Sequence, residues 1–343
     1  MNSEIIKYVA GGGKTTRAID ILSKNSRGLY LAYTNSVVSE VNEKGYISKT
    51  IDSLFSSFII PKLILLFPLC YGKEIKYFDP DESDFGLKGV GAIHIDENGN
   101  IYAKKSGNIY LTDFNINMNR VDFNNFKSKP YYSIISKIFN KSTTLISNTM
   151  RNELSNYIIK KYPTLIIDIL SARFNFIIID EAQDLSGYKE EFARLLYNSE
   201  IKTYFLGDEN QNIINNGVWF EKIAATEINN HSHRCPDTNC KWIRNNLNIK
   251  IYGNDNLSEI VNIDYDDVYK FNNKDYYLLY TAKRGKDKEI VESWIGEKST
   301  IKSAKGSTIN KSIVIIGKTL KPKCFYTAIT RTRSNVYYTI KKI

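Results

Sequence analysis

The residues best suited to chemistry lie in the stretch 174–184, which reads FNFIIIDEAQD. A short β-branched run that ends in acids predicts a strand buried on both faces of a parallel sheet. The acids then lie at the carboxyl end of the strand, where open α/β sheets bind their ligands. There, one carboxylate could hold Mg²⁺ while a second orients a water. An acidic turn in solvent is the plainer interpretation of an Asp-Glu pair alone.

A glycine-rich loop earlier in the chain offers the complementary chemistry. Residues 11–16 read GGGKTT and lie between a predicted strand at 4–10 and a predicted helix at 17–24. Such a loop lets backbone N–H groups and a helix N-terminus close on phosphate. Lys14 would reach the β- and γ-phosphates, and the Thr15 hydroxyl would bind Mg²⁺. The full G-x-x-x-x-G-K-T pattern has glycine where this chain has Tyr8.

Further strands must place polar residues at the same sheet edge. A predicted strand at 29–34 leads into Thr34 and Asn35, and one at 202–206 ends in Gly207-Asp208-Glu209-Asn210-Gln211. Strands predicted at 276–281, 299–301, 312–316 and 336–340 indicate a second α/β unit. Hydroxyl and amide residues at strand ends, here Thr34, Asn35, Thr50 and Ser53, suit contacts to a phosphodiester backbone. Taken alone, such residues are more often helix caps and turns.

The alternation of predicted strands and helices is interrupted between residues 59 and 164, which indicates an insert. Residues 92–114 alternate apolar and polar side chains around two turns and predict an antiparallel β-meander. Residues 127–173 hold eight Lys or Arg against two acids, with aromatic residues between them. That mixture suits a single nucleic-acid strand, although a solvated helical face explains it nearly as well.

The charge of the chain is concentrated near its end. The net charge is +10, and residues 300–343 hold ten Lys or Arg and no acid. Localised basicity favours a nucleic-acid partner. Four cysteines and no secretory signal favour a cytoplasmic setting. The apolar stretch 58–71 is interrupted by two prolines and a lysine, so we expect core rather than a membrane span.

The order of the motifs resembles that of superfamily 1 helicases of the UvrD/Rep type. The matching segments, in chain order, are AGGGKTT, YTN, TIDSLF, DEAQD, GDENQ, SHRCP, STIKSAKGST and YTAITRTR. The resemblance implies an α/β fold with two RecA-like parallel-sheet P-loop NTPase domains. The first would comprise 1–58 and 165–225, with the α+β insert at 59–164, and the second would comprise 226–343. ATP would bind between the two domains, and single-stranded DNA would cross them.

The resemblance also implies roles for individual residues. The expected catalytic residues are Lys14, Asp180, Glu181, Gln183, Gln211, Arg234 and Arg331. The expected nucleotide ligands are Gly11, Gly12, Gly13, Lys14, Thr15, Thr16, His233 and Gly306, with Mg²⁺ on Thr15 and Asp180. The expected nucleic-acid contacts are Thr34, Asn35, Thr50, Ser53, Trp219, Lys302 and Lys305.

Several positions depart from the family pattern. His233 replaces a tyrosine that stacks on adenine, Thr308 replaces a glutamate near the ribose, and Lys302 replaces a histidine. His231, His233, Cys235 and Cys240 could form a zinc cluster, but zinc ligand pairs usually come from two separated segments. The predicted function is an ATP-dependent translocase or helicase with 3′→5′ polarity. The alternatives are an ATP-gated nucleic-acid sensor that does not unwind, and an RNA helicase.

Overall fold

The computed structural model describes residues 2–63, 67, 72–78, 93–105, 108–110, 142–213, 218–281, 285–317 and 320–339. The basic and aromatic segment predicted at 127–173 is therefore described only from residue 142 onward. The last residues of the predicted meander, 111–114, also lie outside the described residues.

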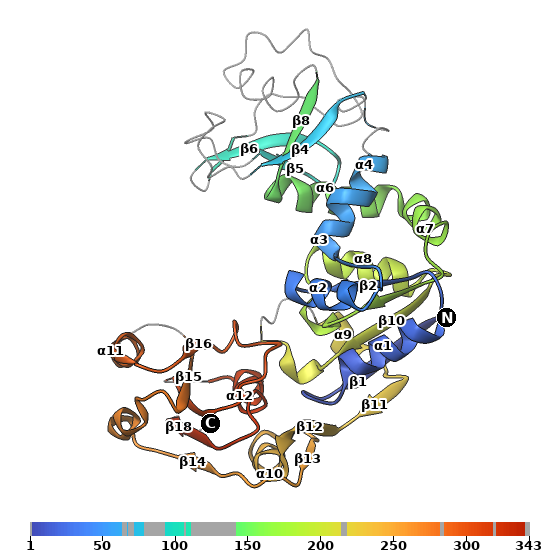
Figure 1. Ribbon diagram of the computed structural model, residues 1–343. Helices are drawn as coiled ribbons and strands as arrows, with labels where there is room; N and C mark the ends of the chain where they lie inside the picture. Colours follow the sequence, from blue (N-terminus) through green and yellow to red (C-terminus); the bar gives the residue numbers. More distant parts are fainter. Residues whose placement is uncertain are drawn as a thin grey trace. The chain divides into compact units, whose positions relative to one another are not determined.

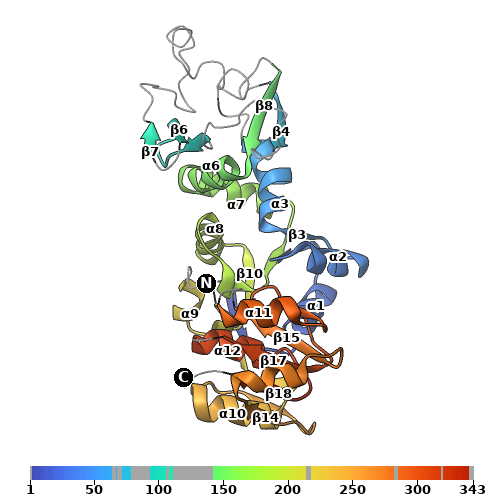
Figure 2. The same cartoon turned by 90° about the vertical axis from the view of Figure 1, so that its left-hand side faces the viewer.

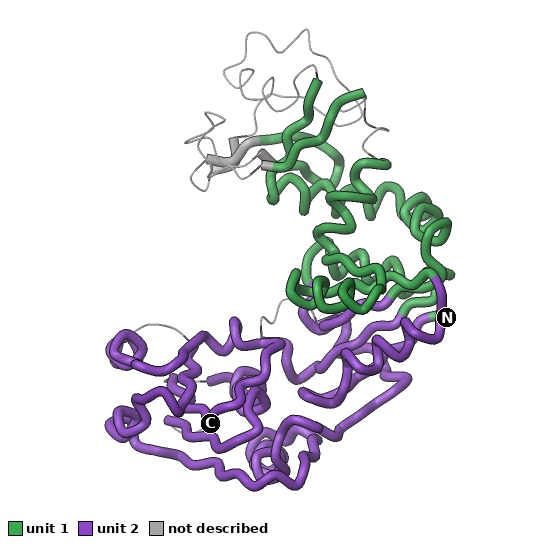
Figure 3. The backbone as a smooth tube through the Cα atoms, viewed as in Figure 1, with its two compact units in different colours: residues 1–2, 27–177, 186–203 green, residues 3–26, 178–185, 204–343 purple. Residues whose placement is uncertain are grey.

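Close packing groups the chain into two units (Figure 3). Unit 1 comprises residues 1–2, 27–177 and 186–203, and unit 2 comprises residues 3–26, 178–185 and 204–343. The glycine-rich loop, the acids at 180–184 and the whole C-terminal part thus fall in unit 2. The domain boundaries expected from the motifs remain a prediction.

The first sheet has six strands in the order β11-β1-β10-β9-β2-β3. The bounds of these strands are β1 Ser3–Tyr8, β2 Gly28–Ala32, β3 Ser48–Thr50, β9 Phe176–Ile179, β10 Lys202–Gly207 and β11 Glu227–Asn229. All four residues of β9 are buried, as the apolar run before Asp180 predicts. The pairs β1–β11 and β2–β3 are parallel. The helices that follow the first two strands are α1 (Lys14–Lys24) and α2 (Asn35–Glu43).

The second sheet lies in unit 2 and is parallel throughout, with the order β14-β18-β17-β15-β16. Its strands are β14 Ile260–Asn262, β15 Tyr276–Tyr280, β16 Lys298–Thr300, β17 Ser312–Ile316 and β18 Val336–Thr339. Four of them match the predicted strands closely. The short β14 has no strong signal, since its three residues are followed by a polar segment.

Helices cover both faces of this second sheet (Figure 2). Ile313 and Ile315 of β17 point into a cluster with α10 (Asp237–Leu247) and α12 (Pro322–Ile329). Val314 and Ile316 point into a second cluster with α11 (Lys286–Ser293) and the 3₁₀ helix at Tyr265–Phe271. Side chains alternate along a strand, so the buried apolar run 313–316 of β17 requires cover on both sides. This two-sided burial is typical of doubly wound α/β folds, and the predicted fold class is confirmed.

Unit 1 contains the insert (Figure 1). Its strands β5 (Ile93–Ile95), β6 (Ile101–Lys105) and β7 (Asn108–Tyr110) form an antiparallel sheet, which confirms the predicted meander. The remaining elements of unit 1 are α3 Ile51–Leu54, the π-helical turn Phe55–Ile59, α4 Ile60–Leu63, β4 Glu74–Phe78, β8 Thr143–Ser147, α6 Asn148–Lys161, α7 Pro163–Ser171 and α8 Tyr188–Tyr197. Strands β4 and β8 pair in parallel.

The meander packs on α6 through a carboxylate. Glu153 Oε1 lies 2.6 Å from Nδ1 of His94, and Glu153 Oε2 accepts the N–H of Ile95 at 2.7 Å. The His94 ring stacks on Tyr102 of β6, with 5.1 Å between ring centroids. These contacts anchor the meander to a helix of the same unit.

Among the described residues, no helix combines the length and the apolar character needed to cross a bilayer.

Candidate nucleotide-hydrolysis site

A cavity of about 460 Å³ lies within unit 2. Its lining residues are Gly11, Gly13, Lys14, Thr15, Thr16, Glu181, Gln211, His233, Arg234, Gly306, Thr308, Arg331 and Arg333. Eleven of them were expected from the motifs, and they come from six separate segments of the chain. Gly12, Asp180 and Gln183, also expected at the site, do not line the cavity, although Asp180 and Gln183 both hydrogen-bond Glu181.

The glycine-rich loop enters α1 with its amides available. Gly13 is the residue before α1 and has no side chain with which to cap the helix. The first N–H groups of a helix have no partner within it and form an anion site together with the helix dipole. The ammonium group of Lys14 lies 3.4 Å from the backbone oxygen of Tyr8. The loop can therefore present both amides and a cation to a phosphate.

Gly11 is required both by its backbone and by its neighbours. Its φ of 71° lies in the left-handed region, and a Cβ there would be 2.6 Å from Cβ of Arg234 and 2.7 Å from Oγ of Ser232. The carbonyl of Gly11 accepts the N–H of His233 at 2.9 Å. Ser232, His233 and Arg234 all belong to β12 (His231–Pro236), which pairs with β13 (Tyr252–Asn254). The phosphate loop thus lies directly against β12.

Glu181 has a strained backbone and a polar environment. Its φ is 51°, which is uncommon for a residue with a side chain and is often seen at functional sites. Asp180 is 7% exposed and accepts the N–H of Glu181 at 2.8 Å. Burial by itself would raise the pKa of Glu181, but Lys14, Lys305 and a hydrogen bond from Gln183 outweigh it and lower the pKa. Glu181 is therefore an ionised carboxylate at neutral pH, as a base requires.

Gln183 connects two of the motifs. Its amide nitrogen donates to Glu181, and its Oε1 accepts the N–H of Asp208 at 3.0 Å. A Cβ on Gly207 would lie 2.5 Å from that Oε1, so glycine is needed at the end of β10. The 3₁₀ helices Ala182–Asp184 and Glu209–Gln211 follow β9 and β10 and place these side chains together.

Two arginines reach the cavity from the C-terminal part. Arg331 is 2% exposed, and its Nη2 donates to Oε1 of Gln211 at 2.8 Å. Arg234 lies close to it, since Nη1 of each arginine is 3.4 Å from the carbonyl of Ser307. Burial lowers the pKa of Arg234 to about 10, and the charge of Arg331 contributes in the same direction. Both guanidinium groups are positioned to bind an anion in the cavity.

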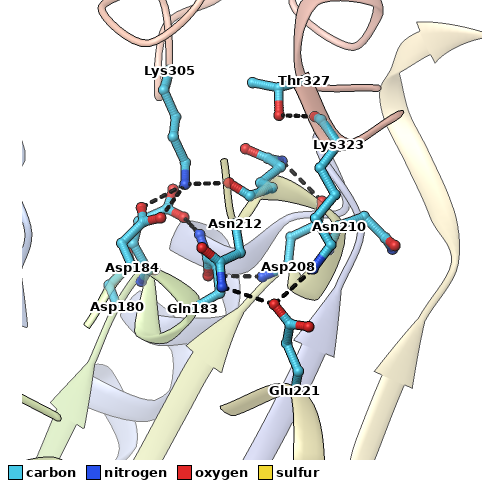
Figure 4. A network of polar contacts seen from close by, with 12 residues as sticks. Asp180, Gln183, Asp184, Asp208, Asn210, Asn212, Glu221, Lys305, Lys323 and Thr327 are labelled. Carbon is cyan, nitrogen blue, oxygen red and sulfur yellow. Dashed lines mark hydrogen bonds and ion pairs between the residues drawn. The ribbon is translucent and has the colours of Figure 1, made fainter. Parts of the chain in front are cut away.

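Lys305 does not take the position predicted for a nucleic-acid contact. Its Nζ lies 2.6 and 2.5 Å from the two carboxylate oxygens of Asp184 and 2.7 Å from the carbonyl of Gln211 (Figure 4). The side chains of Lys305 and Asp184 are only 12% and 2% exposed. Burial raises the pKa of Asp184 to about 6 against the opposing charge of Lys305. The buried acid attracts the lysine inward, which the local sequence could not reveal.

The expectation for Trp219 is also revised. Trp219 begins α9 (Trp219–Lys222), is 7% exposed and packs edge-on against Phe205 at 5.2 Å. A base could reach this ring only after core side chains had moved. Lys302, in contrast, is exposed and stays available for a phosphodiester backbone.

The other predicted nucleic-acid residues lie near helix starts in unit 1. Thr34 and Asn35 are exposed at the beginning of α2. Oγ1 of Thr50 accepts the N–H of Ser53 at 3.0 Å and caps α3. Capping is the role that the plainer interpretation gives these residues, and contact with nucleic acid remains a prediction.

The His and Cys residues of β12 and α10 lie in two different environments. The rings of His231 and His233 are exposed with centroids 5.5 Å apart, whereas Cys235 and Cys240 lie in the apolar cluster under the second sheet. Among the described residues, no group of three or more His, Cys, Asp or Glu is arranged to hold a metal ion. Mg²⁺ commonly uses one or two carboxylates together with substrate phosphates. The oxygen donors of Thr15 and Asp180 fit that requirement.

Sequence reasoning assigned no role to several residues that the site uses. Arg333 lines the cavity two positions after Arg331, and the repeated Thr-Arg of the last motif was its only signal. Ser232 and Tyr326 contact the backbone just before the glycines. Both belong to recognised motifs, but neither residue type indicates a loop contact by itself.

The parallel sheets define an α/β protein, and the glycine-rich loop borders a cavity that is a candidate phosphate site. Residues 100–215 match the family described as UvrD/REP helicase N-terminal domain, a range that contains the acids at 180–184 and the segment 207–211. This match confirms the resemblance to superfamily 1 helicases of the UvrD/Rep type that the motifs indicate. No curated protein matches the chain.

Solved structures with similarity to the chain include viral helicases. The arterivirus nonstructural protein 10 helicase in complex with DNA is 13% identical, with a TM-score of 0.47, and the alignment covers 98% of this chain and 60% of that one. The same arterivirus helicase alone gives 13% identity and a TM-score of 0.46, covering 98% and 59%. The PRRSV helicase gives 12% identity and a TM-score of 0.46, covering 98% and 52%. The chain thus spans between about half and three fifths of the length of these proteins.

Proposed function

We propose that the chain hydrolyses ATP in the described cavity and couples hydrolysis to movement along single-stranded DNA, with 3′→5′ polarity. The observation that supports this most directly is the convergence of Lys14, Glu181, Gln211, Arg234 and Arg331 on one cavity. Phosphoryl transfer depends mainly on positioning and on fixed positive charge around the transferred group. These side chains supply both.

In the proposed reaction, the amides of the glycine loop and Lys14 bind the phosphates. Mg²⁺, held through Thr15 and Asp180, would neutralise phosphate charge. Glu181 accepts a proton from the attacking water, and its lowered pKa keeps it ionised for that task. Arg234 and Arg331 stabilise the charge that grows on the phosphoryl oxygens. Gln211 orients the guanidinium of Arg331 through its 2.8 Å hydrogen bond.

The partner is proposed from charge and exposure. Residues 300–343 hold ten Lys or Arg and no acid. Lys305 pairs with Asp184, Arg331 and Arg333 line the cavity, and the others are proposed to supply the sequence-independent attraction that nucleic-acid binding needs. Exposed Lys302 and the exposed Thr34 and Asn35 are proposed contacts to the phosphodiester backbone. RNA and DNA share this chemistry, so parallel measurements on matched single strands decide between them.

The test of hydrolysis is Glu181→Gln, which removes the base and keeps the shape. Loss of a general base typically costs about 10²- to 10⁴-fold in turnover, while affinity for a fluorescent ATP analogue should stay within about twofold, because the amide carries no new bulk. Glu292→Gln is the matched control, since Glu292 is an exposed residue of α11. Equal turnover in Glu181→Gln and Glu292→Gln would rule out the proposed role of Glu181.

Movement and unwinding are tested separately from hydrolysis. Polarity is read from displacement of a block at one end of a labelled single strand, and unwinding from strand displacement on a forked duplex. ATPase activity that is stimulated by single strands but gives no displacement would identify an ATP-gated sensor instead.

A further inference from the structure

Tyr326 lies fully buried on α12 and contacts two distant parts of the chain through its hydroxyl. The hydroxyl accepts the N–H of Ala10 at 3.1 Å and donates to Oδ2 of Asp208 at 2.8 Å. Burial and the charge of Asp208 hold the pKa of Tyr326 well above its ordinary value of 10, so the proton stays on the phenol at neutral pH. Ala10 immediately precedes the glycine loop.

The contact continues beyond Asp208 to the cavity. Oδ2 of Asp208 also accepts a hydrogen bond from Nε2 of Gln211 at 2.9 Å. Oε1 of Gln211 accepts a hydrogen bond from Nη2 of Arg331 at 2.8 Å. Donor and acceptor ends of the Gln211 amide are therefore both fixed. Asp208, Gln211 and Arg331 are at most 2% exposed, so water cannot easily replace a lost partner.

The other polar group of Ala10 is held from the same side. The Ala10 carbonyl accepts a hydrogen bond from the Ser232 hydroxyl at 2.6 Å. The Ser232 Oγ in turn accepts the N–H of Cys235 at 3.0 Å. The peptide groups of Ala10 are thus bonded to side chains of β12 and α12. The loop lacks the usual first glycine at Tyr8, and these contacts fix its entry in another way.

We propose that Tyr326 is a positioning residue that fixes the phosphate loop and the Gln211–Arg331 pair relative to each other. The proposal rests on the function proposed above. Without the hydroxyl, the Ala10 N–H has no partner in this network, and Oδ2 of Asp208 loses one of its two side-chain donors, while Oδ1 keeps the N–H of Asn210. The hydrogen bonds that connect the phosphate loop with the guanidinium of Arg331 are then broken, so their relative positions are no longer fixed. Both nucleotide affinity and turnover depend on Tyr326.

The test is Tyr326→Phe, which removes one oxygen and keeps the ring in the core. Affinity for a fluorescent ATP analogue should fall severalfold, and kcat should fall about tenfold, the usual effect of one buried hydrogen bond in a network. Tyr337→Phe is the control, because its hydroxyl makes an exposed bond to Glu259 and neither residue lines the cavity. Values in Tyr326→Phe that equal those of Tyr337→Phe would overturn the proposal.

A double-mutant cycle with Arg331→Lys tests whether the effect passes through the arginine. If Tyr326 acts by positioning Arg331, the combined loss in kcat should be smaller than the product of the two single losses. A purely structural role predicts independent, multiplicative losses, and that outcome would overturn the link to Arg331. Asp208→Asn keeps the volume and removes one acceptor site, so it should reproduce the kcat loss if Tyr326→Phe does not fold. Wild-type values in Asp208→Asn would equally overturn the proposal.

The binding measurement separates this proposal from the proposed function. A wild-type protein that binds ATP without hydrolysing it would refute the function, while weaker binding by Tyr326→Phe would still support the positioning of the loop. A wild-type protein that hydrolyses ATP, with an unimpaired Tyr326→Phe variant, would refute the positioning role alone.

Discussion

Replacing Lys305 with methionine should destabilise the protein rather than weaken its grip on nucleic acid. Lys305 makes three contacts of 2.5 to 2.7 Å with the Asp184 carboxylate and the Gln211 carbonyl. Removing one partner of a buried ion pair costs about 3–5 kcal/mol, because the other charge stays buried and unpaired. We take the lower end, about 3 kcal/mol at pH 8, since Asp184 can take up a proton instead.

The loss should depend on pH with a definite sign. The folded-state pKa of Asp184 is about 6, above its ordinary value of 3.8. Its contribution to stability is therefore fully present below pH 3.8 and is lost as pH rises through 6. Near pH 5 Asp184 is largely protonated in the wild type, so Lys305→Met removes hydrogen bonds there without leaving a buried carboxylate unpaired. The loss should then shrink to about 1 kcal/mol.

Chemical denaturation at pH 5 and pH 8 measures both values. Lys302→Met is the matched control, because Lys302 is exposed and its loss should change stability by less than about 0.5 kcal/mol. Affinity for single-stranded DNA should fall in Lys302→Met more than in Lys305→Met. The double variant Lys305→Met with Asp184→Asn should regain part of the lost stability. Unchanged stability in Lys305→Met, together with a specific loss of DNA affinity, would refute the reasoning.

Three further outcomes are expected. Arg331→Ala and Arg234→Ala should each lower kcat by about 100-fold or more with little change in ATP affinity. The reason is that both arginines are proposed to contact charge that grows in the transition state. Equal losses in binding and turnover would make them ground-state ligands. DNA affinity should fall steeply with salt in a filter-binding titration, since counterion release drives it, and a flat dependence would contradict the electrostatic interface. Replacing residues 90–115 with a Gly/Ser linker should lower the melting temperature and ATPase together if the meander is a structural cover, whereas loss of strand displacement alone would identify a strand-separating pin.

The sequence predicts the central strands and loops well because their signals are local. An apolar run that ends in acids and a glycine loop between strand and helix each require one arrangement. The meander was equally readable from its alternation and turns, and the structure confirms it. Short strands such as β11, β13 and β14 were missed, since three residues carry too little pattern to stand out from a loop.

What the sequence does not predict is the set of contacts of side chains whose positions depend on distant partners. Lys305 was assigned to nucleic acid because it stands in a basic, glycine-flanked motif, but a buried Asp184 from another segment binds it. Trp219 was assigned to a base, and Phe205 holds it in the core. Tyr326 had no assigned role, because its two contacts lie 316 and 118 residues away in the chain. Such pairings follow from the fold and leave no signal in the local sequence.

The two hydroxyls that hold Ala10 also determine when the phosphate loop can be completed during synthesis. Ser232 and Tyr326 lie 222 and 316 positions after Ala10, so the ribosome makes the loop first and its supports much later. A nascent chain that has emerged only as far as residue 225 carries the glycines without either support. Contacts between such distant positions form late in folding, because a long loop must first be closed. The proposed nucleotide site is therefore complete only once the C-terminal half has been translated. A fragment that ends before residue 232 lacks both hydroxyls and is unsuitable for measuring ATP affinity.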